Sequence, residues 1–255
     1  MKETPLLMNG EMVRATLAGL KTNTRRLDGL AEFNKKPDLW VFNKRMDGHH
    51  AIAFHKDGGD AIPVKCPFGQ PGDRLWVRET HAVFQQLCDG ISIGTPDYVY
   101  KADDNRSHKE LNEYARKISD KNYSDYRLIS RGWVPSIHMP RAACRILLTI
   151  TDIRIERVQD ITPYDACCEG VLVELPPVLQ GKQIFPDGFD AWSEGRKDEW
   201  FESTARANYI AQTEVMRKLT DGFRHLWDSI YAKRGMGIAA NPWVWVVTFK
   251  MIDKD

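Results

Sequence analysis

The chain has 255 residues, in which 36 lysines and arginines against 35 aspartates and glutamates give a formal net charge of +1. This charge excludes a strong overall positive field, so nucleic acid could bind only at a local basic patch. The five cysteines are irregularly spaced and no apolar run is long enough to span a membrane, so we expect a cytoplasmic protein with free thiols and no membrane partner.

The first predicted element is a short amphipathic helix close to the N-terminus. Asn9 is suited to cap this helix, and Gly19 lies where the helix would end. Between them, residues recur at the spacing of a buried helix face: Met12, Val13, Thr16, Leu17 and Leu20. The residues that follow Gly19 are therefore expected at a helix exit, anchored by an apolar face.

A lysine, a threonine and two arginines follow this helix. Lys21 and Thr24 lie three residues apart, and Arg25 and Arg26 come next. An amine beside a hydroxyl can activate it as a nucleophile, and arginines can hold a carbonyl or a phosphate. The alternative is a solvated helix end, since basic residues there interact favourably with the helix dipole. Residues three apart in a strand face opposite sides, so Lys21 and Thr24 can converge only if the segment forms a turn or a helix end.

The middle of the chain alternates short strands with polar stretches. Turn-forming residues at 66–73 lead into a predicted strand at 74–80, whose side chains alternate in polarity. A second strand is predicted at 97–101, and a hairpin strand at 51–54. Three stretches rich in charge, Gly or Pro are predicted insertions: 31–62, 103–132 and 175–218.

The C-terminal half is predicted to supply two helices and two strands. Residues 145–158 form a strand or hairpin with one buried and one solvated face, and a short helix with a Thr-Pro start covers 162–170. Apolar residues at 223–231 predict an amphipathic helix, and residues 241–249 form the clearest strand. Few long helices with several short strands predict one α+β domain over residues 1–255, a small β-barrel with helices on its rim.

Three side chains of the predicted strand 74–80 and of a predicted loop are weighed as candidates for a binding cleft. Glu79 could line the mouth of a barrel, but a solvent-facing carboxylate paired with Arg78 or Arg74 is the favoured interpretation. Trp133 lies in a predicted loop and is the better candidate for stacking on a base, whereas core packing is favoured for Trp76. No Cys-x-x-Cys or His-Glu-x-x-His spacing occurs, so we expect no metal site.

Four blocks of the sequence occur together in order: Ala-Gly-x-Lys-Thr-x-Thr-Arg at 18–25, the Pro-Gly-Asp turn and strand at 70–79, Ile-Thr-x-x-x-Ala-x-x-Glu-Gly at 161–170, and the apolar strand at 241–249. Together they resemble the ASCH domain, a PUA-like β-barrel related to RNA-binding folds. With Pro-Ser-Ile-His-Met-Pro at 135–140, the pattern is similar to large ASCH proteins carried by phages and prophages. The resemblance implies a PUA-like barrel with long insertions.

Small bacterial members of this superfamily are amidohydrolases that remove the acetyl group from N4-acetylcytidine. They use a lysine, a threonine and a glutamate, which the resemblance places at Lys21, Thr24 and Glu169. It therefore implies hydrolysis of an N-acylated pyrimidine nucleoside, with Thr24 as nucleophile, water as second substrate and no cofactor. Which of Lys21 and Glu169 is the base stays open. The amine must be uncharged to accept a proton, and the carboxylate could either transfer protons or hold the lysine charged.

Substrate binding is assigned to four side chains: Arg25, Arg26, Glu79 and Trp133. The alternative function is an RNA- or nucleic-acid-binding module in which Lys21, Arg25 and Arg26 contact phosphate, and a third possibility is a ribonuclease that uses the same cleft. The near-zero net charge favours a small nucleoside over an extended nucleic acid as the partner. The sequence does not indicate an oligomeric state.

Overall fold

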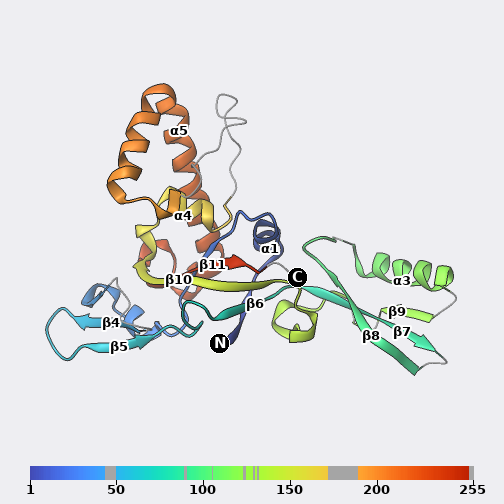
Figure 1. The fold of residues 1–255 in the computed structure, drawn as a ribbon. Coiled ribbons are helices and arrows are strands. Elements are labelled where there is room, and N and C mark those ends of the chain that lie inside the picture. Colours follow the sequence, from blue (N-terminus) through green and yellow to red (C-terminus); the bar gives the residue numbers. More distant parts are fainter. Residues whose placement is uncertain are drawn as a thin grey trace. The chain divides into compact units, whose positions relative to one another are not determined.

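The protein has mixed α+β architecture in a computed structural model, which describes residues 1–43, 50–88, 91–104, 106–122, 125–128, 130, 132–171 and 189–252 (Figure 1). The strands are β1 (Glu3–Leu7), β2 (Asn23–Arg26), β3 (Trp40–Phe42), β4 (His50–His55), β5 (Ile62–Lys65), β6 (Arg74–Arg78), β7 (His81–Cys88), β8 (Ile91–Tyr100), β9 (Asp125–Leu128), β10 (Leu147–Arg157) and β11 (Trp243–Met251). The α-helices are α1 (Gly10–Leu17), α2 (Ala31–Asn34), α3 (His108–Asn122), α4 (Pro163–Cys168) and α5 (Glu194–Tyr231). Short 3₁₀ helices cover Pro37–Leu39, Ser136–His138, Arg141–Ala143, Val158–Asp160, Phe189–Ala191, Ala232–Arg234 and Ile238–Ala240.

Five strands form the largest sheet, in the order β1-β6-β10-β11-β2, and two smaller sheets have the orders β3-β4-β5 and β8-β7-β9. These sheets and helices confirm the predicted α+β class. The predicted closed barrel is wrong for the strands that the structure describes, because β1 and β2 are the two edges of an open sheet. Closure needs the edge strands to pair with each other, and these edges are only five and four residues long.

The chain divides into two compact units, and neither is continuous in sequence. The first unit comprises Met1–Thr22, Cys66–Ile153 and Val247–Asp255, and the second comprises Asn23–Lys65 and Arg154–Val246. The prediction of a single elaborated domain with three insertions stays a prediction.

Local sequence signals account for α1 in the first unit. The Asn9 side chain accepts a hydrogen bond from the backbone N–H of Met12 at 2.8 Å, so the predicted cap is confirmed. Gly19 follows the helix with a positive φ of 72°, a conformation that suits glycine. Val13, Ala15 and Thr16 form the buried side of the helix.

A small hydrophobic cluster joins α3 to the sheet β8-β7-β9. Ala82 and Phe84 are two residues apart and face the same side of β7, and Leu111 and Ala115 lie one turn apart on α3. All four are buried. The predicted insertion 103–132, expected to form a loop or an exposed helix, therefore contains the packed helix α3 and the strand β9.

The turn before β6 is held together by the carboxylate of Asp73. This carboxylate accepts hydrogen bonds from the backbone N–H groups of Lys2 at 2.7 Å and Gln70 at 3.2 Å. Gly69 has a φ of 124°, and a Cβ built there would lie 2.7 Å from Oδ2 of Asp73. Gly72 also has a positive φ, 91°, but a Cβ there meets nothing within 4 Å.

We expect Gly69→Ala to destabilise the chain more than Gly72→Ala. Both variants force alanine into a positive φ, but only the first pushes a methyl group into the Asp73 carboxylate. The difference should be about 1–3 kcal/mol, the cost of disturbing a buried acceptor. Urea unfolding of the two variants measures it, and equal free energies of unfolding would contradict the role given to this contact.

The core of the second unit lies between α4, α5 and β11. The helix predicted at 223–231 is the end of the 38-residue α5, whose buried side carries Phe223, Trp227 and Tyr231. They pack with Val244 and Val246 of β11. β11 is buried continuously from Trp243 to Val247, as expected for a strand covered on both faces. The start of α5 is the feature that the sequence pattern missed.

The described part of residues 31–62, predicted as an insertion, contains α2 and most of the sheet β3-β4-β5. The side chain of Asn34 takes the place of a strand partner for Trp243. Its amide donates to the Trp243 carbonyl at 2.9 Å and accepts from the Trp243 N–H at 2.7 Å. Aromatic contacts continue from Trp243 through Phe42 to Phe33.

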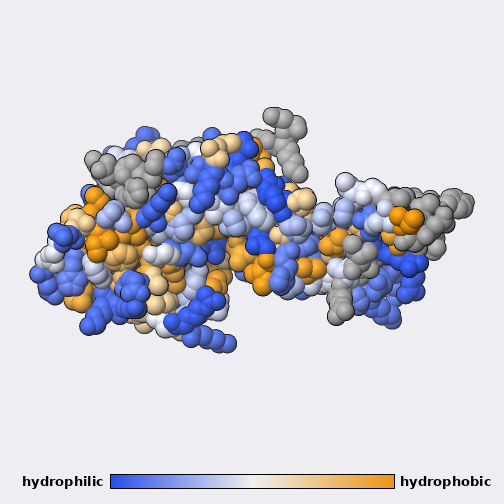
Figure 2. Space-filling view, turned by 90° about the horizontal axis from the view of Figure 1, so that it is seen from below, coloured by the Kyte–Doolittle hydropathy of each residue, from blue (hydrophilic) through white to orange (hydrophobic). Residues whose placement is uncertain are grey.

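Among the described residues, no helix is both long enough and apolar enough to cross a membrane. On the face shown in Figure 2, hydrophobic residues lie interspersed with hydrophilic ones. Scattered exposed hydrophobic side chains are normal for a folded protein and do not by themselves mark a binding surface.

Candidate active site

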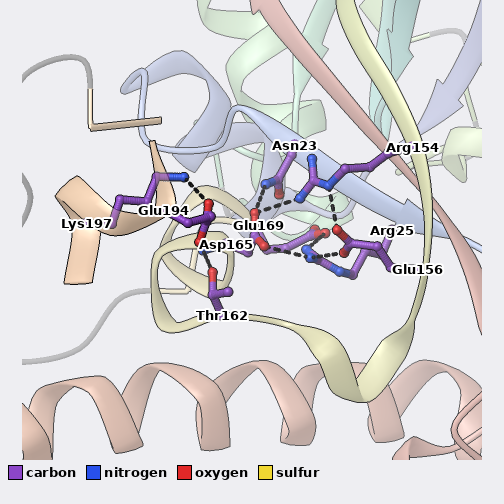
Figure 3. A network of polar contacts seen from close by, with 9 residues as sticks. All are labelled: Asn23, Arg25, Arg154, Glu156, Thr162, Asp165, Glu169, Glu194 and Lys197. Carbon is purple, nitrogen blue, oxygen red and sulfur yellow. Dashed lines mark hydrogen bonds and ion pairs between the residues drawn. The ribbon is translucent and has the colours of Figure 1, made fainter. Parts of the chain in front are cut away.

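An arginine of β2 lies at the centre of a group of acidic side chains (Figure 3). The side chain of Arg25 is 0% exposed. Its Nη1 lies 3.2 Å from Oε1 of Glu169, and its Nη2 lies 3.1 Å from Oε2 of Glu156 and 3.1 Å from Oδ2 of Asp165. The ring of Phe223 lies 5.6 Å from Arg25 Cζ, within reach of a cation–π contact. Both terminal nitrogens of Arg25 are therefore engaged inside the protein.

Together with Arg154, three of these charged groups form a closed ring, which we call the ion-pair ring: Arg25, Glu156, Arg154 and Asp165. Arg154 donates from Nε to Oε1 of Glu156 at 2.6 Å and from Nη2 to Oδ1 of Asp165 at 2.9 Å. Arg25 binds the other oxygen of each carboxylate. The ring alternates two positive and two negative groups, so it carries no net charge. Glu169 binds Arg25 from outside the ring.

Local periodicity brings these side chains together. Arg154 and Glu156 are two residues apart on β10, so they face the same side of the strand. Asp165 and Glu169 are four residues apart at α4, so they share a face of that helix. The Thr162 hydroxyl caps the helix by accepting from the Asp165 N–H at 3.0 Å, which confirms the predicted helix start.

Charge pairing outweighs burial at Asp165 and Arg154. Burial alone raises the pKa of the Asp165 carboxyl, but Arg25 and Arg154 hold that pKa below its usual value. Burial lowers the pKa of Arg154, and Glu156 and Asp165 together raise it above its usual value. The stability that Asp165 contributes is therefore present above its unfolded pKa of about 3.9 and is lost as the pH falls through the lower pKa of the folded state.

The three residues assigned to catalysis are all buried. The exposed fractions are 2% for Lys21, 2% for Thr24 and 4% for Glu169. Lys21 lies in the irregular segment between α1 and β2, Thr24 lies in β2, and Glu169 directly follows α4. The boundary between the two units runs between residues 22 and 23, so Thr24 and Glu169 belong to one unit and Lys21 to the other. The convergence of all three side chains stays a prediction.

Two of the four residues assigned to substrate binding lie at the ends of strands. Arg26 ends β2 and is half-buried. Glu79 follows β6 and is buried, and Arg145 clamps it through Nε at 2.7 Å and Nη2 at 2.9 Å. The favoured expectation for Glu79, a solvent-facing carboxylate paired with Arg74 or Arg78, is wrong. Because β6 ends at Arg78, the alternation of side chains along the strand does not determine the direction of Glu79.

The remaining candidate, Trp133, is half-buried in the first unit. Its Nε1 donates to the carbonyl of Arg106 at 2.7 Å, and its ring packs against the cluster between β7 and α3. These contacts explain its position without a ligand, and its role in stacking stays a prediction. Trp76 is also half-buried and lies outside the buried core, since it alternates on β6 with the buried Leu75 and Val77.

Sequence reasoning missed Arg154, Glu156 and Asp165. Charged residues alternate with Ile153 and Ile155 on β10, and this pattern predicted a solvated face. In the folded chain α4 and β2 supply charged partners to that face. The only signal in the sequence was the opposite sign of the charges.

Two further features of the described residues concern metal ligands and the thiol of Cys167. There, no group of three or more His, Cys, Asp or Glu side chains is arranged to hold a metal ion. Burial and the neighbouring Cys168 raise the pKa of the Cys167 thiol to about 11. This thiol is therefore protonated at neutral pH, which makes it a poor nucleophile.

The structure thus gives a buried polar cluster in which Arg25 binds Glu169 and Asn23 binds Asp165 from one face of β2. Thr24 lies between these two residues on the strand, so its side chain faces the opposite side. Compared with protein-family models, with curated proteins and with solved structures, the chain matches none of them.

Proposed function

We propose that this protein hydrolyses an N-acylated pyrimidine nucleoside, an amide like that of N4-acetylcytidine, on a PUA-like ASCH fold. The catalytic residues are Lys21, Thr24 and Glu169. One observation carries the proposal: none of these side chains is more than 4% exposed. A solvated helix end would leave Lys21 and Thr24 in water. Burying an amine, a hydroxyl and a carboxylate costs free energy, so their burial at the three positions that the resemblance assigns favours a site over a surface.

The proposed reaction proceeds in two steps. The Thr24 hydroxyl oxygen attacks the acyl carbon, and the C–N bond breaks as the nucleoside amine leaves with a proton. Water then attacks the Thr24 ester, releasing the carboxylic acid and restoring the hydroxyl. Lys21 and Glu169 carry the proton from the attacking oxygen to the leaving nitrogen. Glu169 enters this reaction beside Arg25, whose Nη1 lies 3.2 Å from its Oε1.

The RNA-binding alternative has less support. It requires Arg25 to contact phosphate, but this side chain is 0% exposed and binds three carboxylates. Phosphate binding at Arg25 would have to break these ion pairs, and removing a partner from a buried pair is costly. Arg26 is half-buried and remains the better candidate for contact with an anionic group.

The proposal predicts that the purified chain releases cytidine and acetate from N4-acetylcytidine. Chromatography of the products over time measures the reaction, and a panel of pyrimidine nucleosides with longer N-acyl groups defines the acyl pocket. No added cofactor should be needed. Absence of hydrolysis with every acylated pyrimidine would contradict the proposal. Tight binding of a single-stranded RNA that persists at about 150 mM salt would then favour the RNA-binding alternative.

A further inference from the structure

We infer that Arg25 is a positioning residue, which the ion-pair ring holds so that its Nη1 orients the carboxylate of Glu169. The inference rests on the proposed function, because it concerns how the proposed catalytic carboxylate is placed. It assigns to Arg25 a role different from substrate binding, and it gives Glu156, Arg154 and Asp165 a role that supports Arg25.

The geometry of the guanidinium carries the first step. Its planar fork is rigid, so fixing one part of it fixes the direction of the rest. Glu156 and Asp165 both bind Nη2 of Arg25 at 3.1 Å, from β10 and from α4 respectively. Nη1 is thereby aimed at Oε1 of Glu169, 3.2 Å away. Figure 3 shows this arrangement, with Arg25 between the three carboxylates.

The second step concerns why Arg25 itself is held so firmly. Arg154 binds the remaining oxygens of the same two carboxylates, Oε1 of Glu156 and Oδ1 of Asp165. Each ring carboxylate thus bridges two arginines and cannot rotate without losing a charged hydrogen bond. Phe223 also lies beside the guanidinium. Arg25 is therefore constrained from β10, α4 and α5.

Charge balance separates Glu169 from the ion-pair ring. The ring is complete and neutral without Glu169, so structural closure does not require this fifth charged group. Glu169 is 4% exposed, and burying a carboxylate carries a desolvation penalty that charged partners such as Arg25 offset. Because Glu169 lies outside the ring, its carboxylate can be oriented by Arg25 without being needed to close the ring.

The test compares the same substitution at two arginines of the second unit, the buried Arg25 and the half-buried Arg157. Arg25→Lys keeps a positive charge but removes the fork that binds Glu169. Arg157→Lys is the matched control, because Arg157 lies on β10 outside the ring, binds Asp38 at 2.7 Å and lies over the ring of Trp243. Steady-state hydrolysis of N4-acetylcytidine gives kcat and KM for the wild type and both variants.

We expect Arg25→Lys to lower kcat about 10- to 100-fold with KM nearly unchanged, since displacing a catalytic group by about 1 Å costs about that much. Arg157→Lys should keep the wild-type values. Glu156→Gln keeps the shape of the ring and removes one charge, so it should lower kcat less than Arg25→Lys. If Arg25→Lys fails to fold, the kcat and KM of Glu156→Gln test the positioning role of Arg25 instead. A rise in KM with kcat retained, or equal losses in the Arg25 and Arg157 variants, would overturn the inference.

A spectroscopic readout keeps this inference separate from the proposed function. The side-chain carboxyl ¹³C resonance of Glu169, assigned by its loss in Glu169→Gln, should move in Arg25→Lys and stay in place in Arg157→Lys. An unmoved resonance in Arg25→Lys would overturn the positioning role even if the variant lost activity. If the wild type hydrolyses no acylated pyrimidine, the proposed function fails, and the resonance still decides whether Arg25 orients Glu169.

Discussion

Replacing Lys21 by methionine is expected to lower kcat for N4-acetylcytidine by about 10²- to 10⁴-fold, the usual contribution of a positioned proton-transfer group. Methionine has an unbranched side chain of similar length and no amine, so it fills the space of Lys21 but cannot transfer a proton. Lys21 is 2% exposed, and a residue so buried cannot contribute through a solvated charge at a helix end. The loss should therefore appear in kcat, with the fold retained.

The measurement is kcat for Lys21→Met, with Lys35→Met as the control. Lys35 is an exposed lysine of the second unit that pairs with Glu32 at the surface. Circular dichroism and melting temperature establish that both variants are folded. Lys35→Met should behave as the wild type, because exposed ion pairs contribute little. Wild-type kcat in a folded Lys21→Met variant would remove Lys21 from the mechanism and leave Glu169 as the only proton carrier proposed.

Features that depend on neighbours in the sequence were predictable. The α1 helix, its Asn9 cap and its end before Gly19 follow from residues within one or two turns of each other. The Thr162 cap of α4 and the strand β11 were equally local. In each case one hydrogen bond or one run of apolar residues decides the conformation, and no distant partner is needed.

Features that depend on distant pairing were not predictable. Closure of a barrel depends on whether β1 and β2 meet, which their own residues do not encode. The contact between Arg25 and Glu169 joins residues 144 apart, and that between Arg25 and Glu156 joins residues 131 apart. A charged strand face looks the same in sequence whether water or another charged element covers it. For this reason the sequence did not indicate that Arg25 binds Glu169 and Glu156.

Removing the hydroxyl of Thr24 should abolish nearly all hydrolytic activity, whereas replacing Thr24 by serine, which keeps a hydroxyl, should not. Thr24→Val keeps the β-branched shape that suits β2 and deletes only the nucleophilic oxygen, so kcat should fall by about 10³-fold or more. Thr24→Ser retains a hydroxyl on a less constrained side chain, and it should keep a measurable part of the rate. Thr22→Val makes the same change two residues earlier, just before β2, and should leave kcat near that of the wild type.

The comparison of these three variants separates a nucleophile from a hydrogen-bonding residue. A hydroxyl that only binds substrate would raise KM when it is lost, and kcat at saturation would change little. A nucleophile that forms an ester with the acyl group should also trap that group, so a rapid quench of wild-type protein with excess substrate should yield a chain heavier by one acetyl, absent in Thr24→Val. If Thr24→Val turns over at the wild-type rate without an acetyl adduct, water activated by Glu169 becomes the remaining candidate for the nucleophile. If Thr24→Val carries the acetyl group itself, another side chain is the nucleophile.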